Sequence, residues 1–394
     1  MFEDLPIAKD DPILSLGIAY KADPRDNKID LGIGVYRNEQ GQTPVMQAVT
    51  AAQNRLLAQQ TTQAYIGLAG NAEYNQAMLD LLLTGNAAYS RSIAMQTPGA
   101  SGALRLLADL IASAKPNATV WLSNPSYVNH QPIMQAAGLK VAFYPYFNPA
   151  SKQVDEAAML EQVAKLGPDD VLLLHGCCHN PTGADISFSA WQSITELALK
   201  NGFLPFVDLA YQGFGQGLEE DIKGLSHLAN RVPELLLASS NSKSFGLYRE
   251  RSGVAIVVGE TLQQATNARG KLFELARRSY TMPPNWGASI VAEILNNSQL
   301  KAQWENELNQ MSLRMRSLRQ NLADEFNLQS NSERFSYFTQ HQGMFSLTGF
   351  SHQHTEQLRE QHAIYIVGGG RINIAGLAQQ QIPRLVEACL AVGV

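Results

Sequence analysis

The sequence predicts an α/β fold: a mostly parallel sheet covered by helices on both faces, with a smaller α+β domain beside it. Two observations predict it. Through the middle of the chain, short and almost purely apolar runs alternate with longer helical patterns, whereas both chain ends depart from this alternation. Strands buried on both faces of a parallel sheet have such continuous apolar runs. The chain has 394 residues, 45% of them hydrophobic, and can therefore bury a large core.

The central elements alternate in type along the chain. Short runs of apolar residues predict strands, and longer stretches with a helical period predict helices. The predicted strands are "ATVWLS" (118–123), "KVAFYPY" (140–146), "DVLLLHG" (170–176), "FLPFVD" (203–208), "ELLLASS" (234–240) and "GVAIVVG" (253–259). The predicted helices are "AAMLEQVAKL" (157–166), "WQSITELALKNG" (191–202) and "TLQQATNARGKLFELARR" (261–278).

Both chain ends have a different pattern. The N-terminal part contains one strand-like run, "IDLGIGVY" (29–36), and the C-terminal part opens with a long helical pattern (300–326). Two strand-like stretches, "GMFSLTG" and "AIYIVGGGRINIAG", and a closing helix follow. We expect residues 1–43 to form an N-terminal arm and part of the small domain, 44–309 the large domain, and 310–394 the rest of the small domain.

Composition narrows the class of protein. Charged residues make up 16% of the chain and its net charge is −5. No basic stripe is present, so we expect no nucleic-acid binding, and we interpret "RMRSLR" (314–319) as a solvated helix face. We expect neither a spanning helix nor a secretory signal, because no apolar run reaches roughly 20 residues and the N-terminus is acidic. The three cysteines, Cys177, Cys178 and Cys389, indicate a reducing cytoplasm without a disulfide framework.

Chemistry is expected at the carboxyl ends of the parallel strands, where ligands bind in open α/β sheets. Asp208 closes a buried apolar run, which is costly unless the carboxylate is paired. It either caps a following helix or faces a cationic ring nitrogen, and Tyr211 could reach the same pocket. A second candidate is the glycine-rich turn of Gly99, Ala100 and Ser101, which opens a helix and offers backbone N–H groups to an anion.

The segment "CCHNPTG" follows the strand that ends at Gly176. Cys177, Cys178 and His179 are adjacent and suggest a metal site. In an extended segment, however, successive side chains point to opposite faces and cannot converge on one ion. We therefore expect no metal. The following four residues, 180–183, have the composition of a turn.

Lys243 lies in "SSNSKSFGLYRERSG" (239–253), among hydroxyl groups and close to Arg251. One interpretation is an ordinary surface lysine. The other is an amine that condenses with an aldehyde, with Ser240, Ser242 and Arg251 binding a neighbouring phosphate. A phosphate, a pyridine nitrogen facing Asp208 and an aldehyde together describe pyridoxal 5'-phosphate (PLP).

Over nearly its whole length the chain resembles the class I aspartate and aromatic amino-acid aminotransferases of PLP fold type I. The resemblance implies a seven-stranded central sheet and a large domain that binds PLP. The matching blocks are "KIDLGIGVYRNEQGQTPV", "AYIGLAGN", "TPGASGALR", "VWLSNPSYVNH", "LLLHGCCHNPTG", "PFVDLAYQGF", "SNSKSFGLYRERSG", "RRSYTMPPNWGASIV", "GMFSLTG" and "GRINIAG".

The resemblance assigns catalytic roles to three residues. Lys243 would hold the cofactor aldehyde and shuttle the proton, Asp208 would keep the pyridine nitrogen protonated, and Tyr211 would bind the phenolic oxygen together with Asn180. Tyr127 would stack on the ring. The implied phosphate ligands are Gly99, Ala100, Ser101, Ser240, Ser242, Arg251 and, from the partner subunit, Tyr65. His130 and His175 would lie beneath the ring, unless they are ordinary core histidines.

The resemblance also implies a substrate site. Arg371 would clamp the α-carboxylate with help from Asn180, Tyr127 and the backbone of Gly34, while Arg277 would reach an ω-carboxylate from the other subunit of a homodimer. An apolar plug would help to cover the site as the small domain closes. The plug residues are Pro12, Ile13 and Leu14.

Three positions depart from the aspartate branch of the family, where Tyr127 is usually Trp, Ser101 is usually Thr and Met282 is usually Asn. The last two resemble the aromatic branch. The expected activity is ping-pong transfer of an amino group from tyrosine, phenylalanine or tryptophan, and also from aspartate or glutamate, to 2-oxoglutarate. The alternatives are an aspartate aminotransferase with weak aromatic activity, a PLP β-lyase or decarboxylase, and a catalytically silent binding protein.

Overall fold

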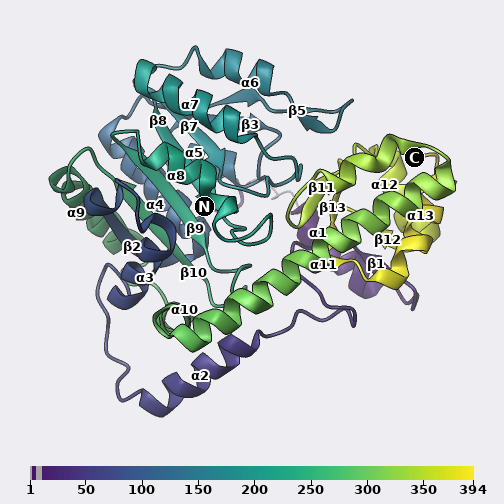
Figure 1. Ribbon diagram of the computed structural model, residues 1–394, viewed down its shortest axis with the longest axis horizontal. Helices are drawn as coiled ribbons and strands as arrows, with labels where there is room; N and C mark the ends of the chain where they lie inside the picture. Colours follow the sequence, from purple (N-terminus) through teal and green to yellow (C-terminus); the bar gives the residue numbers. More distant parts are fainter. Residues whose placement is uncertain (1, 6–10) are drawn as a thin grey trace.

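The computed structural model describes residues 2–5 and 11–394, with Pro12 described by its backbone alone. The chain forms two lobes that a single long helix joins (Figure 1). The helices are α1 (Pro12–Ala22), α2 (Gln47–Gln59), α3 (Ala72–Leu83), α4 (Gly99–Ala114), α5 (His130–Ala136), α6 (Glu156–Val163), α7 (Phe188–Asn201), α8 (Lys223–Ala229), α9 (Leu262–Ser279), α10 (Asn285–Asn296), α11 (Ser298–Ser330), α12 (His352–His362) and α13 (Ile382–Ala391). The strands are β1 (Ile29–Asp30), β2 (Ser92–Pro98), β3 (Thr119–Asn124), β4 (Lys140–Pro145), β5 (Phe147–Asn148), β6 (Gln153–Val154), β7 (Asp170–His175), β8 (Leu204–Leu209), β9 (Leu235–Ser240), β10 (Ser252–Val258), β11 (Phe345–Leu347), β12 (Ile364–Tyr365) and β13 (Arg371–Asn373).

The large lobe is built on a seven-stranded sheet in the order β2-β10-β9-β8-β7-β3-β4. Only β10 runs against its neighbours, so the prediction of a mostly parallel sheet is confirmed. All six central strands predicted from the sequence are present. The seventh strand, β2, was missed because Gln96 and Thr97 interrupt its apolar pattern, although both are fully buried. Gln96 is satisfied there, since its side chain accepts from Asn71 N–H and donates to the carbonyl of Pro284.

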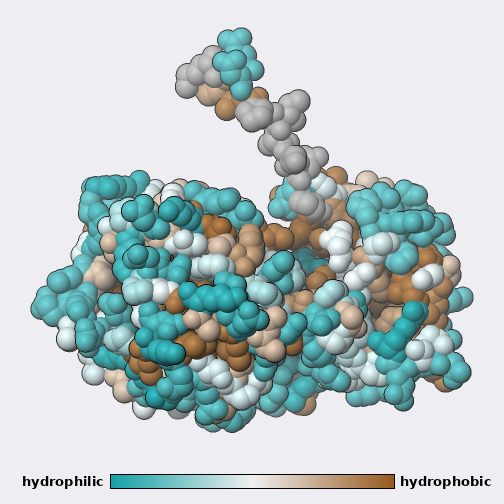
Figure 2. All heavy atoms as spheres, turned by 90° about the horizontal axis from the view of Figure 1, so that it is seen from above, coloured by the Kyte–Doolittle hydropathy of each residue, from teal (hydrophilic) through white to brown (hydrophobic). Residues whose placement is uncertain are grey.

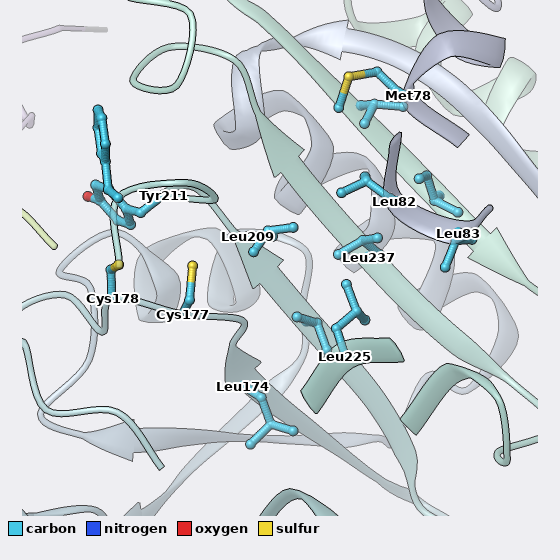
Figure 3. Packing of buried hydrophobic residues seen from close by; sticks show 14 of the residues in the cluster. Met78, Leu82, Leu83, Leu174, Cys177, Cys178, Leu209, Tyr211, Leu225 and Leu237 are labelled. Atoms are coloured by element: carbon cyan, nitrogen blue, oxygen red, sulfur yellow. The ribbon is translucent and has the colours of Figure 1, made fainter. Parts of the chain in front are cut away.

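Helices cover both faces of this sheet. One core lies between the sheet and α4, α5 and α9, and the other lies beneath α3, α7, α8 and α10. Figure 3 shows part of the second core, where Leu82, Leu83, Leu225 and Leu237 converge. The predicted helices 191–202 and 261–278 correspond to α7 and α9. Thr261 and Gln264 fix the start of α9 as a capping box.

Both chain ends contribute to the small lobe. A third core contains Ile29 and Leu31 together with residues of α11, α12 and α13, and β1 pairs in parallel with β12. The prediction of a strand over 29–36 was wrong beyond Asp30. The carboxylate of Asp30 accepts from the N–H groups of Gly32 and Ile33, and this local turn competes with strand pairing. The predicted boundary at 309/310 falls inside α11, and the division into domains stays a prediction.

The long helix α11 carries a buried cation. Arg319 donates to the carbonyls of Gly343 (2.9 Å) and Phe345 (2.6 Å) and to the hydroxyl of Ser346 (2.7 Å), and only 2% of its surface is exposed. The interpretation of 314–319 as a solvated face was therefore wrong at its last residue. The guanidinium ties α11 to the loop that leads into β11.

The surface is mainly polar. In Figure 2 teal and white residues cover most of the face seen from above, and brown apolar residues gather in patches between them. Among the helices described here, none combines the length and apolarity that a bilayer crossing requires. Cys177, Cys178 and Cys389 are all free and buried, as expected for a chain without a disulfide framework.

Replacing Arg319 with leucine should destabilise the protein strongly, because the buried carbonyls and hydroxyl that it serves would lose their donor. We expect a loss of roughly 3 kcal/mol and a thermal midpoint lower by several degrees. The matched control is Arg316→Leu, which changes an exposed arginine on the same helix and should leave the midpoint nearly unchanged. Equal midpoints for the two variants would show that Arg319 is not a structural anchor.

Candidate functional site

Register in the central sheet brings the predicted polar groups together at one edge. His175, at the end of β7, pairs with Asp208 on β8, and Ser240, at the end of β9, pairs with Gly253 on β10. Pro98, which precedes α4, pairs with Ser252, the first residue of β10. A pocket of about 210 Å³ opens at this edge. Its lining includes Gly34, Ala100, Ser101, Tyr127, His175, Asn180, Asp208, Tyr211, Ser240, Ser242, Lys243 and Arg251.

Asp208 is buried at the floor of the pocket and does not cap a helix. Its Oδ2 accepts a hydrogen bond of 2.8 Å from Nε2 of His130, at the start of α5. Ser126 Oγ lies 2.9 Å from the other ring nitrogen of His130 and 3.4 Å from Nε2 of His175. The second oxygen, Oδ1, is buried and has no hydrogen-bond partner among the described residues. A buried acceptor without a partner calls for a donor from a ligand.

The surroundings keep Asp208 ionised. Burial alone would raise the pKa of Asp208, but the hydrogen bond and charge of His130, with smaller contributions from His175 and Lys243, bring this pKa below its usual value. Burial, together with the neighbouring His130, lowers the pKa of His175 to about 3. His175 is therefore neutral at physiological pH, and the open oxygen of Asp208 presents negative charge to the pocket.

Lys243 projects into the pocket from the segment after β9. Its Nζ lies 4.9 Å from the centre of the Tyr211 ring. Burial lowers the pKa of Lys243 to about 8, with Asp208 opposing the shift and Arg251 adding to it. The amine therefore loses its proton far more readily than an ordinary lysine, whose pKa is about 10.4. A neutral amine is a nucleophile for a carbonyl carbon.

A cradle for an anion lies beside Lys243. Arg251, held at a φ of 51°, donates to Ser242 Oγ (3.2 Å). Gly99 lies against it: a methyl group there would come within 2.5 Å of Arg251 Nη2, and its φ of 69° also favours glycine. The first N–H groups of α4, at Ala100 and Ser101, have no partner within the helix. Guanidinium, hydroxyls and N–H groups thus face one volume.

Arg371 approaches from the small lobe. It is buried on β13, donates through Nη2 to the carbonyl of Gly32 (2.7 Å), and lies over the ring of Phe345 with 4.5 Å between its guanidinium carbon and the ring centre. Its Nε has no hydrogen-bond partner among the described residues. Phe345 in turn meets the edge of Tyr211, whose hydroxyl accepts a bond of 3.4 Å from the amide of Asn180. A cation with a free donor thus lies beside the pocket.

Two predicted residues lie away from the pocket of this chain. Tyr65 is 91% exposed, and Arg277 is exposed near the end of α9. Of the predicted plug, Pro12 begins α1 and its side chain lies outside the described residues, Ile13 is half-buried and Leu14 is 68% exposed. Among the residues whose side chains are described, Tyr65, Arg277, Ile13 and Leu14 do not line the pocket.

Several lining residues were missed from the sequence. Cys177, Leu104, Ala210 and Tyr248 also line the pocket, and Ser126 connects the two histidines beneath it. Each of these residues lies within one of the sequence blocks quoted above. Counting every residue just beyond a strand end as a candidate would have found Cys177, Ala210 and Ser126, but not Leu104, which lies inside α4, or Tyr248, which lies well after β9.

The argument against a metal at 177–179 rested on an extended backbone, and that premise was wrong. Cys178 has a φ of 51° and leaves the extended region. The thiols of Cys177 and Cys178 and a carboxylate oxygen of Asp221 lie within 4.8 Å of one another. His179 turns away, with its ring nitrogens near the hydroxyls of Ser123 and Thr182.

Comparisons with known proteins agree with this geometry. Residues 26–389 match the family described as aminotransferase class I and II. The chain belongs to this family. It is 43% identical to an aromatic-amino-acid aminotransferase of Pseudomonas aeruginosa (96% of this chain and 95% of that protein). It is 41% identical to an aspartate aminotransferase of Salmonella typhi (100% of each chain).

A solved structure connects the family to its cofactor. The aromatic-amino-acid aminotransferase of Burkholderia pseudomallei, described as covalently bound to pyridoxal phosphate, superimposes with a TM-score of 0.96 at 34% identity, covering 100% of this chain and 99% of that one. This aminotransferase has PLP fold type I, and its cofactor is PLP. The unpartnered Oδ1 of Asp208, the amine of Lys243 and the anion cradle at Arg251 fit the ring nitrogen, aldehyde and phosphate of that cofactor.

Attachment of PLP to the cofactor-free aminotransferase should depend on pH through Lys243. The protonated amine cannot attack an aldehyde, so the rate of attachment should rise about tenfold per pH unit and level off above its pKa of about 8. Stopped-flow absorbance of the cofactor measures this rate. The Lys243→Ala variant should show no covalent phase. A rate that still climbed steeply between about pH 9 and 10 would show that burial does not lower this pKa.

Proposed function

We propose that this aminotransferase transfers the amino group of tyrosine, phenylalanine and tryptophan, and also of aspartate and glutamate, to 2-oxoglutarate by a ping-pong reaction. The observation that carries the proposal is that Lys243 and Asp208 line one pocket, with one oxygen of Asp208 open, while Arg371 lies next to that pocket, across the ring of Phe345, and has a free donor. Relatives named for aromatic amino acids and for aspartate, at similar identity, support a range that includes both substrate classes.

PLP supplies an electron sink for the carbanion that forms at the substrate α-carbon. Lys243 would hold the aldehyde of the cofactor and, as a free amine, would carry the proton of the substrate α-carbon. Asp208 keeps the ring nitrogen protonated through its open oxygen, and His130 fixes the orientation of the carboxylate. Tyr211 and Asn180 bind the phenolic oxygen, and Tyr127 stacks on the ring.

The phosphate occupies the cradle described above. Arg251 and Ser242 supply charge and a hydroxyl, and the hydrogen bond between them presets their positions. Ser240 and the N–H groups of Ala100 and Ser101 at the start of α4 complete the set, with Gly99 leaving room for the guanidinium.

Arg371 binds the substrate α-carboxylate, with Asn180 and the backbone of Gly34 assisting. Its contact with the carbonyl of Gly32 leaves Nε and one further nitrogen for a bidentate carboxylate. Arg277 pairs with the ω-carboxylate of dicarboxylic substrates. Met282, beside Ile66 N–H at 3.1 Å, gives that end of the site an apolar side chain that an aromatic substrate can contact.

A homodimer explains the residues that lie away from the pocket of their own chain. Tyr65 and Arg277 would serve the partner subunit's site, Tyr65 at the phosphate and Arg277 at the substrate. Large exposed apolar side chains on the N-terminal elements, among them Leu14, Ile18 and Leu57, provide surface for such an interface. The segment at 12–14 would cover the site as the lobes close. We place the enzyme in the cytoplasm, where reduced thiols persist.

Lys243→Ala should keep cofactor binding and abolish turnover, because the phosphate cradle is intact while the proton carrier is lost. We expect transamination to fall by more than about 10³-fold. The measurement is 2-oxo acid formation in the presence of saturating PLP, with cofactor retention checked after gel filtration. Turnover within tenfold of the unmodified enzyme would refute the proposed reaction.

Arg277→Gln should separate the two substrate classes. Aspartate would lose its charge partner, so its kcat/KM should fall by about 100-fold, equivalent to about 2.7 kcal/mol. For phenylalanine, kcat/KM should change by less than about threefold. The matched control is Arg278→Gln, which alters an exposed arginine that pairs with Glu274 and should affect neither substrate. Equal losses for aspartate and phenylalanine would rule out the assigned role.

A further inference from the structure

Two neighbouring thiols meet a carboxylate just beyond the end of β7. The left-handed backbone of Cys178, at a φ of 51°, brings its side chain to the same side as that of Cys177. Figure 3 shows both sulfur atoms pointing in the same direction from the loop. A carboxylate oxygen of Asp221 joins them, and all three ligand atoms lie within 4.8 Å of one another. A tetrahedral zinc site needs sulfurs at about 2.3 Å from the ion, which this spacing permits.

Backbone N–H groups hold the carboxylate of Asp221 in place. Asp221 Oδ2 accepts from the N–H groups of Gly213 (2.8 Å) and Gly215 (2.9 Å), and Oδ1 accepts from that of Gln216 (2.7 Å). Each oxygen keeps lone-pair capacity beyond these bonds. Such contacts orient a metal ligand in the way that outer-shell groups do in known metal sites.

A second oxygen lies near the carboxylate of Asp221. A methyl group built on Gly215 would lie 2.5 Å from Asp221 Oδ1 and 2.7 Å from Gln342 Oε1, so these two oxygens border one small volume. A cavity of about 300 Å³ reaches this volume from outside, and Cys177, Asp221 and Gln342 all line it. An ion therefore has a route of entry and three ligand atoms close together, and the oxygen of Gln342 near Asp221 is the candidate for a fourth.

Charges of both signs surround the thiols. Asp185 adds negative charge, and the buried guanidinium of Arg319 lies near enough to influence Cys178. The hydrogen bond with the Cys178 thiol, followed by burial, raises the pKa of Cys177 well above its ordinary value. Thiolates are the form that binds a metal, so binding of a divalent ion would release the protons of both thiols to solvent.

We propose that Cys177, Cys178 and Asp221, with Gln342 as the fourth ligand, form a binding site for one thiophilic divalent cation such as Zn²⁺. Two thiolates and two oxygens in a tetrahedral arrangement suit zinc and cadmium, and soft thiolates disfavour magnesium and calcium. The two thiolates and the carboxylate leave one net negative charge on the occupied site, which Arg319 offsets.

Metal binding at this site would affect catalysis through Cys177. This residue lines both the metal cavity and the cofactor pocket, and it lies two residues after His175 and three before Asn180. A metal that fixes Cys177 and Cys178 would restrain the loop that carries Asn180. Micromolar Zn²⁺ should therefore inhibit the aminotransferase, and a chelator should restore its activity.

The test is titration of the intact holoenzyme with Zn²⁺ in competition with a chromophoric chelator. We expect one equivalent per chain, weakened at least about 100-fold by Cys178→Ser. Cys389→Ser is the matched control, because it removes the other free, buried cysteine from the small lobe and should leave binding unchanged. Equal affinity in Cys178→Ser and Cys389→Ser would overturn the proposal.

A second measurement does not depend on any variant folding. Cd²⁺ added to the unmodified holoenzyme should produce an ultraviolet thiolate-to-metal charge-transfer band that saturates at one equivalent, and Zn²⁺ should displace it. Mg²⁺ at the same concentration should produce no band. The absence of a saturable band would overturn the proposal whether or not the enzyme is a transaminase of the proposed specificity.

Discussion

The buried carboxylate of Asp208 is the constraint on which the site depends. A carboxylate in the interior must be paired, and this one is paired on one oxygen only. The hydrogen bond from His130 keeps it ionised and fixed, and leaves the other oxygen directed at a ligand. Parallel pairing of β8 with β7 and β9 then fixes where His175 and the segment after Ser240 lie relative to it. The position of Lys243 follows from that register.

The small lobe brings Arg371 to the side of the pocket through a series of contacts that begins in α11. Arg319 anchors the loop before β11, β11 pairs with β13, and β13 carries Arg371 to the side of the pocket. Phe345 lies between Arg371 and Tyr211, so the guanidinium proposed to bind substrate and the phenol proposed to bind the cofactor share one aromatic neighbour. A movement of the small lobe would therefore move the carboxylate clamp relative to a fixed cofactor floor, as closure of the site requires.

The segment after β7 lines two cavities. On one side it offers Asn180 to the cofactor pocket, and on the other it offers two thiols to the proposed metal site. The left-handed residue Cys178 makes this possible, because it turns the chain between the two faces. The backbone N–H groups of Cys178 and His179 both donate to the carboxylate of Asp185, which holds the turn in place.

The sequence by itself determined the central strands and the family, because long apolar runs and short sequence motifs are local properties. It did not determine features that depend on distant partners. Strand β2 was missed because its polar residue Gln96 is satisfied by Asn71 and Pro284, which are 25 and 188 residues away in the chain. Arg319 is buried because carbonyls from another segment surround it, and the thiols converge because of one backbone angle. Tertiary structure decided these points, since burial and hydrogen bonding are set by which segments meet, and no local pattern records that.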